Sequence, residues 1–215
     1  MAVTLDTRQA DFARSFEALL GRKQELSAEV GDVVSAIIAR VRREGDDALI
    51  ALTRQFDWPM DDMEAARVTG DDLTQARAAV APETVAAFAH AAARIRAYHE
   101  RQLPADAHWT DAVGIELGWR WTPLDSVGLY VPGGTASLSS SVLMNAIPAK
   151  VAGVGRLVMV TPTPGGRLDP ATLVAAEIAG VDEIWRIGGA QAVAALAYGT
   201  ASLAPVDTIV GPGNA

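Results

Sequence analysis

The chain has 215 residues, a formal net charge of −8 at pH 7, 50% hydrophobic residues and no cysteine. This length and apolar content allow a sizeable buried core, and an acidic balance without a basic stripe argues against nucleic acid or an anionic membrane as partner. The lack of cysteine excludes disulfides, thiolate metal sites and cysteine nucleophiles. Residues 1–10 contain no signal-peptide core, and the most apolar stretch, 142–160, is interrupted by polar and charged residues. We therefore expect a cytoplasmic protein without a membrane span.

Residues 1–126 predict a mainly helical region. Apolar side chains recur at helical spacing from Ser27 to Glu44, and Gly45 follows where such a helix would end. The last helix of the region begins at Pro82, because the first turn of a helix tolerates proline. Together the predicted helices cover residues 27–44, 46–56, 72–80 and 82–102.

A few short strands are also expected in this region. One is predicted at Ala66–Val68. Between His108 and Pro123 apolar residues alternate with others, which indicates a half-buried strand. The alternating residues are Ile115, Leu117, Trp119 and Trp121.

Residues 127–215 alternate strands and helices regularly. Strands are predicted at 127–131, 157–161, 183–187 and 208–210, and helices at 141–152, 170–179 and 190–198. Such alternation is typical of right-handed βαβ crossovers and a parallel sheet. The sequence therefore predicts an α/β fold, with a helical N-terminal region (1–126) and a Rossmann-like parallel sheet with helices on both faces (127–215), incomplete at its C-terminal end.

Each predicted strand of the second region ends in a loop rich in glycine or proline. The loops are Pro132–Gly134, Pro162–Gly166, Gly188–Gly189 and Gly211–Gly213. A tight turn explains any one of them equally well. Because the carboxyl ends of parallel strands meet at one edge of a sheet, the four loops together predict a ligand-binding edge.

Common catalytic motifs are missing from the chain. No G-x-G-x-x-G follows Val131 and no G-x-x-x-x-G-K-[ST] occurs, so a nucleotide would have to bind in a less usual way. His90, His99 and His108 are nine residues apart, which places the first two on opposed faces of a helix. We therefore expect no metal site in this chain.

Three further polar positions have ordinary explanations. Ser139–Ser141 have no histidine after them in the sheet region, so we expect them to cap a helix. Lys150 is expected to be an exposed helical lysine, although it could bind phosphate. Arg186 is expected to pair with an acid at the sheet edge. We assign no catalytic residue.

The loop sequences resemble those of histidinol dehydrogenase. The resemblance extends upstream, so that it covers nearly the whole chain in the order of the family. One local departure is Leu138–Ser139, where members often carry Tyr-Pro. The matching segments are VGLYVPGGT (127–135), SVLMNAIPAKVAG (141–153), RIGGAQA (186–192), IVGPGN (209–214), GDDAL (45–49), RQFD (54–57) and YHERQ (98–102).

Members of this family are homodimers that oxidise L-histidinol to L-histidine with NAD and a bound zinc, the last step of histidine biosynthesis. The resemblance implies NAD contacts at Tyr130, Gln191 and Asn214, each at or just beyond the end of a predicted strand. In the family the zinc ligands, the general-base pair and most substrate contacts lie beyond the Gly-Pro-Gly-Asn motif. The resemblance therefore implies an N-terminal fragment, inactive alone, with zinc ligands beyond Ala215 and exposed apolar surface where the missing half and a partner subunit would pack.

Two other functions stay open from the sequence. A related zinc-dependent, NAD-linked dehydrogenase of another small polar alcohol would share these loops. A non-catalytic nucleotide-binding module that ends at Ala215 would also share them, although its last strand would then be poorly anchored.

Overall fold

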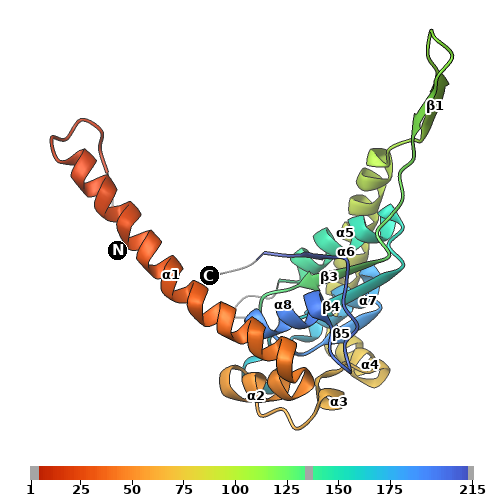
Figure 1. Cartoon of the computed structure of the whole chain (residues 1–215). Coiled ribbons are helices and arrows are strands. Elements are labelled where there is room, and N and C mark those ends of the chain that lie inside the picture. Colours follow the sequence, from red (N-terminus) through yellow and green to blue (C-terminus); the bar gives the residue numbers. More distant parts are fainter. Residues whose placement is uncertain (1–4, 134–137, 213–215) are drawn as a thin grey trace.

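The structure is a computed structural model that describes residues 5–133 and 138–212, with side chains described outside 20–29. At its centre lies a parallel sheet with the strand order β5-β4-β3-β6 (Figure 1). The chain adds β4 and β5 on one side of β3 and then returns to place β6 on the other side. The strand order therefore reverses between β3 and β6, where α/β sheets bind ligands. The strands are β3 (Ser126–Tyr130), β4 (Arg156–Val160), β5 (Glu183–Trp185) and β6 (Thr208–Val210).

Both faces of the sheet are buried. Leu157 and Met159 of β4 belong to one core cluster, and Val158 and Val160 belong to the other. All four side chains are fully buried. This two-sided burial explains why β4 is a continuous apolar run rather than an alternating one.

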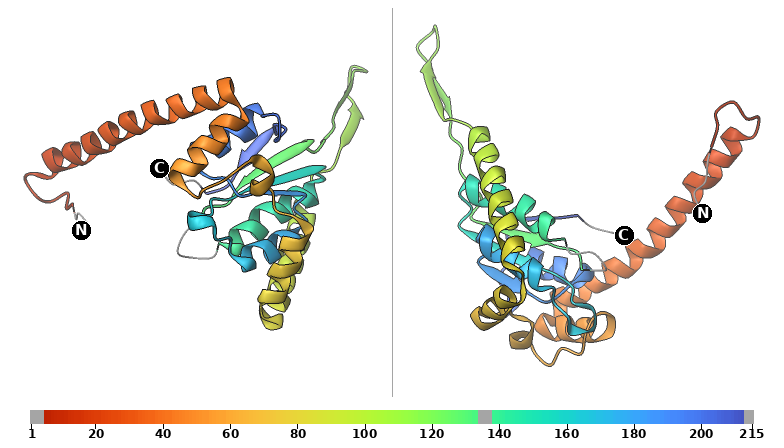
Figure 2. Two further views of the ribbon diagram at one scale, coloured as in Figure 1. Left: turned by 90° about the horizontal axis from the view of Figure 1, so that it is seen from below. Right: turned by 180° about the vertical axis from the view of Figure 1, so that it is seen from behind.

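Helices cover each face (Figure 2). One face is covered by α6 and α7, against which α4 and α5 pack, and the other is covered by α8 together with α1 and α2. The predicted α/β fold with helices on both faces of a parallel sheet is confirmed. The helices are α1 (Phe12–Glu44), α2 (Asp46–Phe56), α4 (Gly70–Ala79), α5 (Pro82–His99), α6 (Ser139–Ala152), α7 (Pro170–Ala179) and α8 (Gly189–Tyr198).

Local capping explains several helix ends. Thr69 and Asp72 form a capping box at the start of α4, in which the Asp72 backbone N–H donates to the Thr69 hydroxyl and the Thr69 N–H donates to the Asp72 carboxylate. Gly153 and Gly180 end α6 and α7 in the left-handed region, with φ of +93° and +80°. Both helices therefore stop where glycine can reverse the chain toward the next strand.

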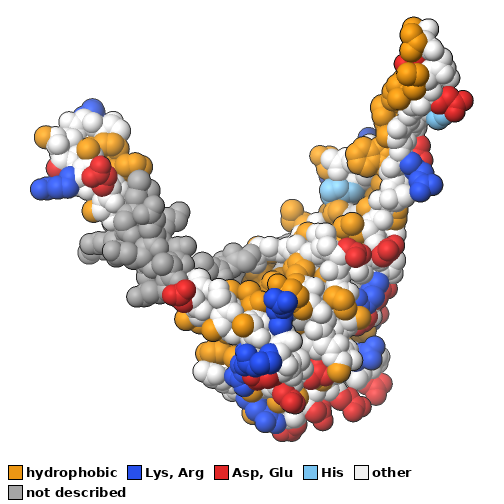
Figure 3. All heavy atoms as spheres, in the orientation of Figure 1, with side chains coloured by type: hydrophobic (Ala, Val, Ile, Leu, Met, Phe, Trp, Pro, Cys, Tyr) orange, Lys and Arg blue, Asp and Glu red, His pale blue; other side chains and the backbone are white. Residues whose placement is uncertain are grey.

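Two segments extend from this body as arms, the N-terminal part of α1 and an antiparallel hairpin of β1 (Ala107–Thr110) and β2 (Glu116–Trp119) (Figure 1). A strand is present between residues 108 and 123, at Glu116–Trp119, but the expectation that it is half-buried is wrong, because all four of its residues are exposed. The hairpin pairs only with itself within the described residues, so its apolar side chains stay open to solvent (Figure 3). The structure thus has the exposed apolar surface that the sequence predicts. The exposed apolar residues of this arm include Trp109, Val113, Ile115, Leu117, Trp119 and Trp121.

Two predicted boundaries also differ from the structure. The helix expected from Ser27 already begins at Phe12. Instead of a strand at 66–68, the chain forms the short helix α3 (Met63–Ala66) followed by a single antiparallel bridge, Arg67 to Trp185. Backbone hydrogen bonds from Val68 to Ile184 and from Arg186 to Ala66 flank this bridge, so the segment covers the open edge of β5.

The helices of residues 1–126 pack directly on the sheet formed by the later residues. The division of the chain into 1–126 and 127–215 therefore stays a prediction about sequence regions. Within the described residues, no helix is both long enough and apolar enough to cross a bilayer.

Candidate functional site

The glycine-rich loops meet at the carboxyl edge of the sheet and are packed tightly against Pro162. A side-chain carbon added at Gly188 would lie 2.3 Å from the Pro162 Cβ, and one added at Gly133 would lie 2.5 Å from the Pro162 carbonyl oxygen. Both distances are shorter than any van der Waals contact, so only glycine fits at either position. Pro162 therefore fills the space between the loop after β3 and the loop after β5 and contacts both.

Tyr130 links two of these loops. It is the last residue of β3, and its hydroxyl accepts a hydrogen bond of 3.1 Å from the backbone N–H of Gly189. Gly189 is the first residue of α8 and has a φ of +68°, which favours glycine. The bond places the tyrosine hydroxyl at the N-terminus of α8, where free N–H groups attract anions.

Gln191 lies beside Gly189 in the first turn of α8. Its side chain is only 3% exposed, and a carbon added at Gly189 would lie 2.7 Å from its Oε1. Its amide is not among the fully buried side-chain atoms of the described residues that lack a hydrogen-bond partner. An amide at the start of a helix can both donate to and accept from a polar ligand group.

The third predicted contact, Asn214, lies outside the described residues. The chain leading to it passes close to β3, because a side-chain carbon on Gly211 would lie 2.1 Å from the carbonyl oxygen of Tyr130. The structure thus brings Tyr130 and Gln191 together around Gly189. The assignment of all three to NAD binding stays a prediction.

A second polar cluster behind this edge was not predicted from the sequence. Asp57 accepts a hydrogen bond of 2.8 Å from the backbone N–H of Thr163, and the Trp58 indole N–H donates to the carbonyl of Arg186 at 3.1 Å. The Arg186 guanidinium stacks over the Trp58 ring. Burial raises the pKa of the Asp57 carboxyl, although the bond from Thr163 and the charge of Arg186 act in the opposite direction. The expected ion pair of Arg186 with an acid is not seen within the described residues, because its guanidinium donates to the Gly166 carbonyl and stacks on Trp58 instead.

The other polar positions singled out in the sequence lie elsewhere. Lys150 pairs with Asp182 at 2.6 Å, at the amino end of the sheet and away from the loops. The serines do not cap α6 as expected, because they lie inside its first turn and Leu138 occupies the N-cap. Among the described residues, no three His, Cys, Asp or Glu side chains gather where they could hold a metal ion.

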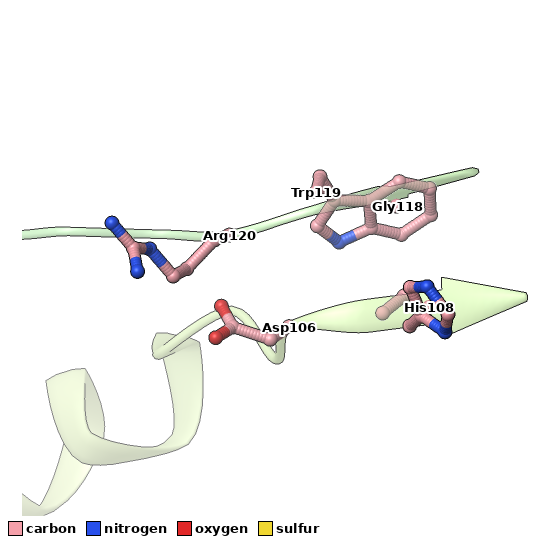
Figure 4. Close-up of a pocket in the computed structure, with 6 residues that line it drawn as sticks. Asp106, His108, Gly118, Trp119 and Arg120 are labelled. Atoms are coloured by element: carbon pink, nitrogen blue, oxygen red, sulfur yellow. The ribbon is translucent and has the colours of Figure 1, made fainter. Parts of the chain in front are cut away.

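The hairpin arm carries a separate hollow of about 450 Å³, lined by residues 106–108 and 118–120. Figure 4 shows His108 and Trp119 on its two facing strands, with Asp106 and Arg120 near its base. The His108 imidazole is exposed and lies 3.8 Å from the equally exposed Glu116 carboxylate. Because solvent screens this pair, the hollow lacks the buried and organised polar groups of an active site.

The comparison with known proteins supports the reading of these loops. A family model described as histidinol dehydrogenase matches residues 20–215. This chain belongs to the histidinol dehydrogenase family. It is 59% identical over 211 residues to histidinol dehydrogenase of Ruegeria pomeroyi, with 98% of this chain and 49% of the relative covered. It is 57% identical over 215 residues to that of Rhodospirillum rubrum, with 100% and 50% covered.

The fold agrees with a solved member of the histidinol dehydrogenase family. The crystal structure of histidinol dehydrogenase from Elizabethkingia anophelis superposes with a TM-score of 0.81 and 34% sequence identity, covering 86% of this chain and 42% of that one. The resemblance stated from the loop sequences is confirmed. The chain spans about half the length of the curated relatives that it matches.

Proposed function

We propose that this chain forms the NAD-binding part of an enzyme that oxidises L-histidinol to L-histidine, the last step of histidine biosynthesis. Family membership supports the reaction. The observation that supports the cofactor assignment is the convergence of the Tyr130 hydroxyl and the Gln191 amide around Gly189, at the N-terminus of α8. A helix N-terminus with polar side chains beside it suits the phosphates and hydroxyls of a dinucleotide.

The residues at the edge fit a dinucleotide. NAD supplies the hydride acceptor when it is bound. The N-terminus of α8 offers free N–H groups to a pyrophosphate, while the Gln191 amide and the Asn214 amide can pair with ribose hydroxyls. Tyr130 provides a half-buried ring for packing and a hydroxyl that orients Gly189. Gly133 and Gly188 allow the loops after β3 and β5 to pack on Pro162 at this edge.

Zinc belongs to the proposed reaction, but the described residues do not fit a zinc site, because they bring no three suitable ligands together. We therefore assign no residue of this chain to zinc. By resemblance, the ligands lie beyond Ala215. The use of NAD in a biosynthetic reaction fits a cytoplasmic location.

We also propose that the active protein is a homodimer and that its formation covers apolar side chains of the hairpin arm, which would otherwise contact water. Sedimentation of wild type, Leu117→Glu and Phe56→Glu tests this contact, because Phe56 is an even more exposed apolar residue on the body. We expect the Leu117 variant alone to dissociate. If neither variant dissociates, the hairpin is not part of the dimer interface.

The cofactor assignment is tested by titrating NAD calorimetrically into the longest polypeptide that the gene encodes. Gln191→Ala should weaken NAD binding by on the order of 1–3 kcal/mol, because a buried polar partner is lost. The control is Gln55→Ala, which removes an exposed amide from α2. Equal affinities of wild type and the Gln191 variant would remove Gln191 from the site.

The substrate assignment needs a separate assay. NAD reduction is measured with L-histidinol and with a set of other small polar alcohols. Preferential oxidation of another alcohol would favour the related dehydrogenase. NAD binding without oxidation of any alcohol by the longest gene product would favour the non-catalytic module.

A further inference from the structure

We propose that Asp57, together with Trp58 and Arg186, positions the candidate cofactor edge by holding the 162–166 turn and, through Pro162, the glycine pair that opens α8. The inference rests on the proposed function, because it takes NAD to bind at this edge. None of the three residues is assigned a ligand contact. They are positioning residues that act through the backbone of the loops.

The first link joins the end of α2 to the turn after β4. The Asp57 carboxylate accepts from the Thr163 N–H at 2.8 Å, and the Asp57 carbonyl accepts from the Gly165 N–H at 3.2 Å. The turn is closed by a bond of 2.7 Å from the Gly166 N–H to the Thr163 carbonyl. One residue thus holds the turn at two points, through its side chain and through its backbone.

The second link joins the same helix end to the loop after β5. The Trp58 indole N–H donates to the Arg186 carbonyl at 3.1 Å, and the Arg186 guanidinium carbon lies 4.4 Å from the centroid of the Trp58 ring. The guanidinium also donates to the carbonyl of Gly166. Arg186 therefore ties the turn after β4 to the strand end that leads directly into Gly188.

The third link carries these restraints to the proposed NAD site. Pro162 immediately precedes the residue that Asp57 holds, and it contacts both Gly133 and Gly188 at distances that leave no room for a side-chain carbon. Interiors packed this closely transmit small displacements rather than absorbing them. A shift of the 162–166 turn would therefore move Gly188 and the N–H groups at the start of α8.

The cluster around Asp57 and Arg186 contains buried polar atoms without hydrogen-bond partners, which lower the stability of the folded state. Within the described residues, five buried side-chain atoms lack a hydrogen-bond partner, and three of them belong to residues of this cluster. Burial also raises the pKa of Asp57, against the effects of the Thr163 bond and the Arg186 charge, so folding disfavours its ionised form. Such local departures from good polar pairing are expected where geometry serves function. The three atoms are Asp57 Oδ1, Thr163 Oγ1 and Arg186 Nε.

The experiment measures NAD dissociation constants and unfolding midpoints of the longest gene product carrying this sequence. Asp57→Ala should raise the dissociation constant about five- to tenfold, because the Thr163 N–H loses its acceptor. Asp57→Asn keeps an acceptor oxygen and should stay within about twofold of wild type. Trp58→Phe keeps the ring but removes the N–H, and should raise the constant about two- to fivefold. This variant keeps the inference testable if Asp57→Ala fails to fold.

The matched control is Glu183→Ala, which breaks a comparably buried pair with Arg156 at the amino end of the sheet. It should lower the unfolding midpoint without changing NAD affinity. If Glu183→Ala weakens NAD binding as much as Asp57→Ala does, general destabilisation explains both and positioning is refuted. If Gln191→Ala weakens binding but Asp57→Ala and Trp58→Phe do not, this inference fails while the proposed site stands. If Gln191→Ala leaves the NAD dissociation constant unchanged, the proposed NAD site is contradicted, and the positioning role that rests on it fails with it.

Discussion

The phenolic oxygen of Tyr130 lies 3.1 Å from the backbone nitrogen of Gly189, so a side chain at the end of β3 accepts a hydrogen bond from the first N–H of α8. Strand end and helix start come from different βαβ units of the sheet. The bond therefore holds the end of β3 against the start of α8 at the carboxyl edge of the sheet.

Replacing Tyr130 with Phe removes this bond and keeps the ring. We expect NAD affinity to fall by about 0.5–1.5 kcal/mol, the usual net value of one hydrogen bond, with little change in the unfolding midpoint. Titration calorimetry and thermal unfolding measure the two quantities. Tyr198→Phe is the control, because its exposed ring contacts Arg42 and lies away from the loops. Unchanged affinity of the Tyr130 variant would show that the hydroxyl does not shape the site.

Replacing Gly188 with Ala tests the close packing of Pro162 against the loop after β5. The added carbon would lie 2.3 Å from the Pro162 Cβ, so the two loops must separate. We expect a loss of stability of about 1–3 kcal/mol, typical of overpacking, together with weaker NAD binding. Gly31→Ala in α1 is the control, because an added carbon there meets nothing within 4 Å and favours the helix. Denaturant unfolding measures the free energy of unfolding of each variant. Equal stability of the Gly188 variant and wild type would contradict the close packing of the loops.

The sequence predicts the sheet and its loops well because both depend on local patterns. Apolar runs of strand length alternate with helical periods from residue 127 onward, and glycine follows each strand end. Gly188 and Gly189 could thus be placed at the carboxyl edge before any contact was known. The same rule places Tyr130 and Gln191 at this edge, since one ends a strand and the other lies in the first turn of a helix, whereas their role in NAD binding is implied by the family resemblance.

Long-range relationships could not be predicted in this way. Trp58 and Arg186 are 128 residues apart in the chain, and nothing local in either segment indicates that they stack. The hairpin shows a second limit, because the sequence predicts its strand but not the burial of that strand. The alternation of Leu117 and Trp119 correctly indicates a strand, but periodicity cannot show whether anything covers its apolar face, and within the described residues nothing does.

The last prediction concerns the pH dependence of stability. Burial raises the pKa of Glu183, but hydrogen bonds from Arg156 and Trp185 and the charge of Arg156 outweigh it, so the pKa is lowered from its usual value of 4.5. The folded state thus binds this proton less readily than the unfolded state. The stabilisation is fully present above pH 4.5 and is lost as the pH falls through the lowered pKa.

We expect Glu183→Gln to lower the free energy of unfolding by about 1–2 kcal/mol at neutral pH and to become as stable as wild type in acid. Urea unfolding followed by circular dichroism measures this difference. Glu177→Gln removes a more exposed pair with Arg77 and should cost little at any pH. A constant difference between the Glu183 variant and wild type across the acid range would mean that the charge of Glu183 contributes nothing to stability.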